Sequence, residues 1–355
     1  MTARNIVSVA AAIAILSTGL IGFNGVAQLP GDQKPQVVSA LGKRFFAKAD
    51  ADGTIAKADA ALAADPDNLD LLIAAARAHD VALQFDTSVA MYTKAIGMAP
   101  NDVRAYRFRG HRFISTRKFD LAIKDLERAL SLAPSSFDVV YHLGLAYVLT
   151  ARFPAAAKTY RACLDRKTPG PALPDGWRDC AALSSSAPPD PARPATAPAS
   201  PPAQDDESRI GISDWLYRSL RRAGRAEEAK VLLAGIPEGL AVKENEAYYR
   251  ALLFYKGVRT EAQVLPDEAY KENTGVTVGY GLANFYLAEG QTAKACALMR
   301  RLVEDEAHWN AFGFIGAEAE LTRANGPCPA QSKWPESRRG CLRQGLPLES
   351  LQRVP

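Results

Sequence analysis

The feature of this sequence that most constrains its fold is a period of 34 residues in its first half. Pro66, Pro100 and Pro134 keep this spacing, and each follows a run with helical periodicity and precedes polar residues. Units of this length cannot bury an apolar face alone, so they must stack on their neighbours. Other sets with the same spacing are Ala61, Ala95, Ala129 and Cys163; Leu62, Ile96, Leu130 and Leu164; Phe85, Phe119 and Phe153; Phe113 and Tyr147; Ala122 and Ala156; Gly110 and Gly144.

The residue types at these positions predict a pair of antiparallel helices in each unit. Glycine at 110 and 144 allows the first helix to approach the second closely. The aromatic residues fill the space between neighbouring pairs, and each proline ends a second helix and turns the chain into the next unit. We therefore predict an all-α solenoid with a concave face.

These positions resemble the tetratricopeptide repeat (TPR) superfamily. The match is best in Phe137–Asp165 and good in Val103–Ser136, where Arg109 stands at a place usually held by leucine. Leu69–Asp102 matches mainly in its second helix, and Gly53–Asn68 looks like the end of a degenerate unit whose partner helix would span Val37–Lys48. The hallmark positions of the best match are Leu143, Gly144, Tyr147, Ala156 and Tyr160.

Composition divides the chain into two helical arrays joined by a linker rich in proline and alanine. Such a linker cannot form a packed core, although Trp177 within it could fold back onto the last repeat. Helical periodicity resumes near Ser208, with Gly224 and Gly290 at predicted turns between helices. The predicted segments are a signal peptide at 1–27, an N-terminal array at 28–168, a linker at 169–207, a TPR-like array at 208–324 and an irregular tail at 325–355.

The N-terminus has the layout of a secretory signal peptide. Arg4 precedes an uncharged apolar stretch from Ile6 to Phe23, and small residues follow up to Ala27. This arrangement predicts export to the periplasm or secretion, with cleavage after Ala27. The alternative is an uncleaved membrane anchor, since the apolar stretch is almost long enough to span a bilayer.

The five cysteines all lie in the predicted exported part, where disulfides are permitted. Cys163 and Cys180 flank one loop, and Cys328 and Cys341 flank another, so these two pairings are favoured. Cys296 lies within a helical pattern and is interpreted as a small buried residue. Neither the cysteines nor the histidines show metal-ligand spacing, so we expect no metal and no cofactor.

No catalytic motif is present, and the carboxylates fall mostly on predicted solvent-facing helix sides, so a non-enzymatic role is favoured. The net charge of +4 is too small to argue for nucleic acid. The prediction is instead a binding scaffold of the cell envelope, with a protein or peptide as its partner.

Helical geometry selects the residues of a candidate peptide groove. A helix advances about 100° per residue, so Tyr106 and Phe113 face one way while Arg104, Arg107 and His111 face the other. If the aromatic side packs inward, the basic side lines the concave face. Equivalent groove positions are Asp138, Tyr141, Leu145 and Val148 in the next repeat, and Asp70, Ile73, Arg77 and Asp80 in the preceding one.

An arginine-rich centre beside an apolar flank suits an extended peptide that carries an acidic residue or its C-terminal carboxylate. Two alternatives remain open. The arginines can pair with acidic residues on adjacent helices, and a buried Arg109 needs a partner such as Asp125 or Asp138. The chain can also be a structural subunit or accessory factor of an envelope enzyme complex, without a groove ligand. Further acidic candidates for such pairs are Asp70, Asp120 and Glu127.

Overall fold

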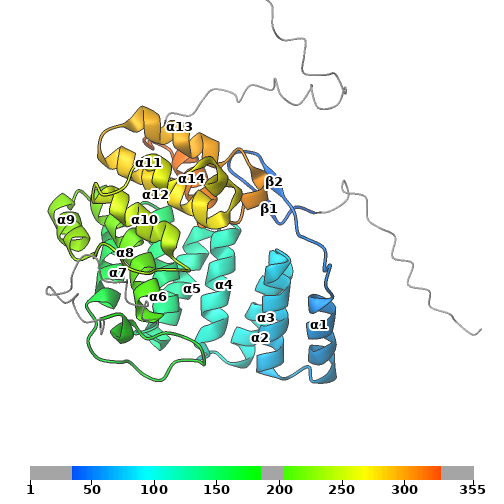
Figure 1. Cartoon of the computed structure of the whole chain (residues 1–355). Helices are drawn as coiled ribbons and strands as arrows, with labels where there is room; N and C mark the ends of the chain where they lie inside the picture. The colour runs from blue at the N-terminus through cyan, green and yellow to red at the C-terminus, as the bar shows by residue number, and fades with distance from the viewer. Residues whose placement is uncertain (1–33, 185–203, 329–355) are drawn as a thin grey trace, which may run out of the picture. The chain divides into compact units, whose positions relative to one another are not determined.

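A row of antiparallel helical hairpins forms the first part of the fold, as the 34-residue period predicts (Figure 1). The structure is a computed structural model that describes residues 34–184 and 204–328. Each helix packs on the next one along the chain. The helices of this row are α1 (Thr54–Ala64), α2 (Leu69–Val81), α3 (Phe85–Met98), α4 (Val103–Ser115), α5 (Phe119–Leu132), α6 (Phe137–Leu149) and α7 (Phe153–Leu164).

The first helix of each hairpin begins at a capping residue that recurs with the period. Asn68, Asp102 and Ser136 each accept a hydrogen bond from a backbone N–H in the first turn of α2, α4 and α6. These side chains satisfy donors that the helix itself leaves unpaired. The same local chemistry therefore starts three successive repeats.

The turn inside each hairpin also recurs. Leu83, Arg117 and Ala151 lie 34 residues apart and have left-handed φ values of 56°, 62° and 57°. Gly224 and Gly290 take the same place in two C-terminal hairpins, with φ values of 75° and 73°. In all five turns, the next residue donates its N–H to a carbonyl in the last turn of the first helix, at 2.8 to 2.9 Å. The C-terminal hairpins thus share the turn geometry of the repeats.

The C-terminal helices pack directly against the repeats. Helix α8 packs against α7 and α12, and α14 packs against α12, α13 and α6. The described residues from Pro35 onward belong to one compact unit. The helices are α8 (Gln204–Arg222), α9 (Ala226–Ala234), α10 (Glu246–Tyr255), α11 (Glu261–Val264), α12 (Asn273–Ala288), α13 (Thr292–Leu302) and α14 (Phe312–Thr322), with short 3-10 helices η1 (Cys180–Ser184), η2 (Asp267–Lys271) and η3 (Glu306–His308).

The hydrophobic core runs without a break from the repeats into the C-terminal helices. Trp215 of α8 is fully buried, and its indole N–H donates to the Tyr141 hydroxyl of α6 at 2.9 Å. Beside it, Asp214 and Arg218 form an ion pair with side chains 0% and 1% exposed. The two helical arrays therefore share one interior.

The segment before α1 is a β-hairpin, and the predicted helix over Val37–Lys48 is wrong. Strand β1 (Val37–Val38) pairs antiparallel with β2 (Arg44–Phe45), around a turn at Gly42 whose φ is 75°. Phe45 is 2% exposed and stacks on Trp309 at a centroid distance of 5.0 Å. The aromatic partners of Phe45, Trp309 and Phe314, lie on the C-terminal part of the chain. The segment therefore packs there and not against α1 as the first helix of a repeat. Figure 1 shows the hairpin beside α14.

Two disulfides join the described cysteines. Cys163 is bonded to Cys180, the pair that the loop between them favoured, with Cα atoms 5.0 Å apart. Cys328 is bonded to Cys296, with Cα atoms 5.5 Å apart, so its expected bond to Cys341 is corrected. Cys296 lies on the buried face of α13, where the chain after α14 returns to meet it. Spacing along the sequence favoured the short loop between Cys328 and Cys341. It could not show that the chain after α14 packs against α13.

Several expectations lie outside the described residues. These are the signal segment 1–27, much of the linker, and the tail that includes Cys341. Among the described helices, none combines the length and apolarity that a membrane span needs. Within the same residues, no cluster of three or more His, Cys, Asp or Glu side chains is placed to hold a metal ion.

Candidate functional site

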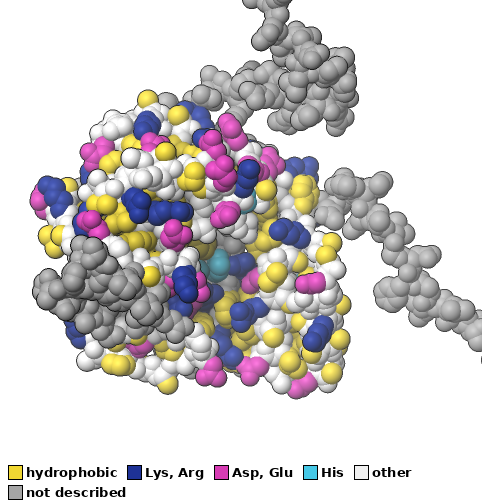
Figure 2. All heavy atoms as spheres, in the orientation of Figure 1, with side chains coloured by type: hydrophobic (Ala, Val, Ile, Leu, Met, Phe, Trp, Pro, Cys, Tyr) yellow, Lys and Arg dark blue, Asp and Glu magenta, His cyan; other side chains and the backbone are white. Residues whose placement is uncertain are grey.

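An open groove lies between the first helices of two repeats and the segment that follows α7. It has a volume of about 660 Å³. One face of the molecule is hollowed in this region, with basic, acidic, histidine and apolar side chains gathered there (Figure 2). We call it the α2–α4 groove and define it by Asp70, Ile73 and Arg77 of α2, Arg104 and Phe108 of α4, and Leu173 and Trp177.

Arg104 lies in this groove but already has carboxylate partners. Its guanidinium forms ion pairs with Asp70 at 2.6 Å and with Asp102 at 2.7 Å. The hydrogen bond to Asp102, with a smaller contribution from Asp70, raises the pKa of Arg104 above its ordinary value. The side chain therefore joins α2 to the start of α4, which is the pairing alternative that the sequence left open.

Arg107 is also held within the fold. Its guanidinium contacts Asp138 at 3.1 Å, and it lies over the Phe108 ring at 4.8 Å and the Trp177 ring at 6.0 Å. Burial lowers the pKa of Arg107, and the charge of Asp138 opposes that shift. Trp177 thus folds back onto the repeats. Asp138 forms an ion pair with Arg107 of the same chain.

Three further predicted groove residues, Leu145, Tyr141 and His111, are buried or lie against the C-terminal helices. Leu145 is 0% exposed, and the Tyr141 hydroxyl accepts the Trp215 indole N–H. His111 lies against Phe312 of α14, with ring centroids 5.3 Å apart. The concave face is therefore open over α2 and α4, and over α6 the chain itself fills it.

Arg77 is the basic side chain of the groove that remains available. It is exposed, and its guanidinium lies 5.2 Å from the centroid of the Phe108 ring. Among the described residues it forms no hydrogen bond or ion pair through its side chain. The 34-residue spacing from His111 predicted Arg77 as a groove position. It did not identify Phe108, Leu173 or Trp177, because Phe108 falls beside the predicted stripe and the other two belong to a segment interpreted as linker.

Arg109, which stands at a leucine-like position, has a carboxylate partner on the second helix of its own repeat. Its Nε and Nη2 atoms donate to Asp125 at 2.7 and 2.8 Å, and its Nη1 atom donates to Thr93 at 3.0 Å. The Asp125 side chain is 7% exposed, so each charge compensates the other in a largely dry place. Of the two candidates, Asp125 is the partner, and Asp138 serves Arg107.

A histidine pair lies where α14 covers α6. The rings of His111 and His142 are 4.5 Å apart, and Phe312 contacts both. The Asp138 carbonyl can only accept, so His142 donates Nδ1–H to it at 2.7 Å. Burial lowers the pKa of both imidazoles well below the ordinary value, and the charges of Arg112 and Arg107 add to the effect.

Acid is expected to destabilise the fold through this pair. Below a pH of about 6.5, unfolded histidines take up protons that the folded pair does not, so the free energy of unfolding should fall by up to about 1.4 kcal/mol per pH unit for each histidine. Burial raises the pKa of Asp214 to about 6, which acts in the opposite direction. The effect is therefore measured as a difference between the wild type and the double variant His111→Asn/His142→Asn, by urea unfolding at a series of pH values.

The free energies of unfolding of the wild type and the double variant should converge as pH falls from 6.5 to 5, because the variant lacks the titrating pair. His308→Asn, at the exposed contact between His308 and Asn273, is the control and should follow the wild type. If the wild type and the double variant stay parallel across this range, the pair does not titrate as argued.

Comparisons with known proteins place one repeat in a family. The family model described as "Tetratricopeptide repeat" matches residues 103–136. No curated protein matched the chain. Among solved structures, YrrB, titled a TPR protein with an unusual peptide-binding site, is similar at 12% identity, covering 71% of this chain and 95% of its own, with a TM-score of 0.38.

Two further structures are similar. A tetratricopeptide repeat protein from Parabacteroides merdae has 14% identity, with coverage of 74% of this chain and 90% of its own and a TM-score of 0.35. The TPR domain of P58(IPK) has 14% identity, with coverage of 76% and 71% and a TM-score of 0.25. The matched repeat coincides with α4 and α5, and its caps, turns and 34-residue spacing recur in the hairpins on either side. Residues 103–136 of the chain are therefore identified as a tetratricopeptide repeat.

Proposed function

We propose that this protein is a non-catalytic scaffold of the cell envelope that binds a protein or peptide partner in the α2–α4 groove. The observation that carries the proposal is Arg77, an exposed guanidinium over Phe108 with no carboxylate partner among the described residues. Neighbouring Arg104 and Arg107 already form ion pairs with carboxylates of the same chain. A groove that keeps one arginine free beside paired ones is suited to an incoming anion.

The groove favours an extended peptide with one acidic group. The guanidinium of Arg77 binds a carboxylate through two parallel hydrogen bonds. Ile73, Phe108 and Trp177 provide apolar surface for the neighbouring side chains. Placement in the envelope rests on the signal-like segment 1–27 and is compatible with the two disulfides, which persist in an oxidising compartment.

A second candidate is a structural subunit without a groove ligand. The observation that favours it is the cover over His111 and Tyr141, where α14 and α8 occupy the middle of the concave face. In that case partners would contact the outer helices, and the α2–α4 groove would only be a gap between packed elements.

Changing Arg77 to glutamate distinguishes the two. We expect Arg77→Glu to keep the fold, because the side chain is exposed and makes no ion pair with a described residue. We expect it to weaken the binding of a groove partner at least about tenfold, because a charge-assisted contact is lost and like charges repel. A partner is first recovered by crosslinking pull-down from the exported fraction, and its Kd for each variant is then measured by interferometry.

Lys124→Glu on α5 is the matched control. It makes the same change of charge at an exposed position that does not line the groove. Equal affinities of the Arg77 variant, the Lys124 variant and the wild type would reject the groove and favour the structural subunit.

A further inference from the structure

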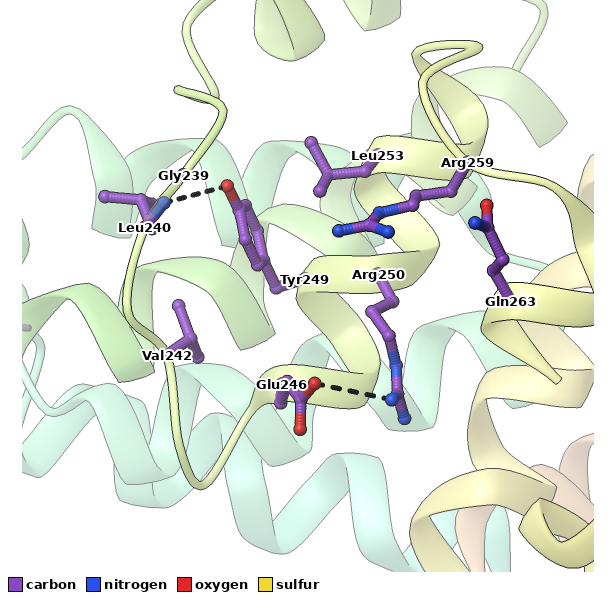
Figure 3. A pocket seen from close by; sticks show the side chains of 9 residues that line it. All are labelled: Gly239, Leu240, Val242, Glu246, Tyr249, Arg250, Leu253, Arg259 and Gln263. Carbon is purple, nitrogen blue, oxygen red and sulfur yellow. Dashed lines mark hydrogen bonds and ion pairs between the residues drawn. The ribbon is translucent and has the colours of Figure 1, made fainter. Parts of the chain in front are cut away.

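A second hollow lies on the C-terminal part of the chain, on the outward face of α10. It has a volume of about 420 Å³, within the range of small-ligand sites. Its walls are the chain between α9 and α10, the α10 face, and the segment from Arg259 to Gln263 (Figure 3). We call it the α10 pocket. It shares no residue with the α2–α4 groove.

One half of the α10 pocket is apolar and fixed in place. Leu253 is 3% exposed and Tyr249 is 6% exposed, and Leu240 and Val242 stand on the opposite wall. The Tyr249 hydroxyl accepts the Leu240 N–H at 3.0 Å and donates to the Pro237 carbonyl at 2.7 Å. These two bonds tie the loop to α10, so the wall is formed before any ligand arrives.

The other half presents N–H donors without acceptors. Arg259 is exposed and makes no side-chain hydrogen bond or ion pair with another described residue, and the Nε atom of Arg250 is buried without a hydrogen-bond partner. The Gln263 carbonyl oxygen accepts the Thr260 N–H at 2.9 Å, so its amide nitrogen keeps two donors free. Figure 3 shows the Arg259 side chain beside Leu253 and near Gln263, whereas the Arg250 guanidinium points away from it toward Glu246.

The charge balance of the pocket is positive. Two arginines face one carboxylate, Glu246, whose Oε1 atom lies 3.3 Å from Nη1 of Arg250. That contact uses a single nitrogen of the Arg250 guanidinium and leaves Arg259 uncompensated. A carboxylate supplies two acceptor oxygens together with the missing charge.

We propose that the α10 pocket binds an apolar carboxylate. The carboxylate lies against the Arg259 guanidinium, with Gln263 donating beside it, and the apolar group rests on Leu253 and the Tyr249 ring. Two sources carry this chemistry, the C-terminus of a peptide that ends in apolar residues and a free aliphatic acid. The inference is independent of the α2–α4 groove, since the residues and elements differ.

The test is calorimetric titration of the full chain with three probes: N-acetyl-alanyl-leucyl-leucine as the free acid, the same tripeptide as its C-terminal amide, and hexanoic acid. We expect the wild type to bind at least one of the two acids with a Kd below about 1 mM and to bind the amide at least about tenfold more weakly than the acid peptide. Arg259→Gln should weaken the binding of that acid at least about tenfold. It should not unfold the chain, because the Arg259 side chain forms no hydrogen bond or ion pair with another described residue.

Lys243→Gln is the matched control, since it removes one positive charge from an exposed position that does not line the pocket. A tripeptide acid that binds at least about tenfold more tightly than hexanoic acid identifies the peptide C-terminus as the ligand, and comparable or tighter hexanoic acid binding identifies the free acid. The proposal is overturned if neither acid binds, if the tripeptide amide binds measurably and as tightly as the tripeptide acid, or if Arg259→Gln and Lys243→Gln have the same effect.

Discussion

Asp214→Ala is expected to lower the free energy of unfolding by about 3–5 kcal/mol, because it leaves a buried guanidinium without a counter-charge. Asp214 and Arg218 are 0% and 1% exposed, and they lie between helices of both arrays. Arg218 is further fixed by a hydrogen bond to the Thr277 carbonyl at 3.1 Å and by its position over the Trp215 ring. Gly281 lies directly against the guanidinium, and a Cβ at this position would clash with it. The loss is read from urea unfolding at pH 7.

The double variant Asp214→Leu/Arg218→Met is the informative control for this prediction. Replacing both charges with apolar groups removes the uncompensated ion, and such replacements are often neutral or stabilising. We therefore expect the double variant to recover most of the stability that Asp214→Ala loses. If the single variant unfolds as readily as the double one, the ion pair does not determine stability at this junction.

Arg117→Ala is expected to cost about 3–5 kcal/mol and to loosen the contact between the first and last parts of the described chain. Its guanidinium forms an ion pair at 2.8 Å with Glu318 of α14, whose side chain is 2% exposed. It also donates to the Trp309 carbonyl at 2.9 Å and lies 5.5 Å from the Phe45 ring centroid. Burial lowers the pKa of Arg117, and Glu318 opposes that shift. Removing Arg117 leaves the Glu318 carboxylate buried without its counter-charge.

Two features of the repeats make this substitution interpretable. Alanine already occupies the equivalent left-handed turn position at 151, so Arg117→Ala does not introduce a residue that the turn excludes. Arg152→Ala breaks a pair with Asp120 whose side chains are 51% and 88% exposed, and this control should cost no more than about 1 kcal/mol. Hydrogen exchange should show faster exchange in α14 for the Arg117 variant alone. Equal protection of α14 in both variants would contradict the interpretation.

The histidine pair and the ion pairs share one origin, which is the docking of the C-terminal helices on the concave face. Helical spacing predicted Arg104, Arg107 and His111 on one side of α4, and internal pairing was an open alternative to ligand binding. It could not decide between them. That decision depends on Asp70, Asp138 and Phe312, which lie 31 or more residues from the side chains they contact.

The sequence by itself determined the repeats. Capping residues, small residues at close helix contacts and left-handed turns act within one or two helices, so their spacing is visible as a 34-residue period. The tertiary structure decided which part of the concave face stays open, which residue bonds to Cys328, and that the segment before α1 forms a β-hairpin. These outcomes depend on contacts between distant segments, where burial and charge compensation outweigh local preference, and such contacts leave no period in the sequence.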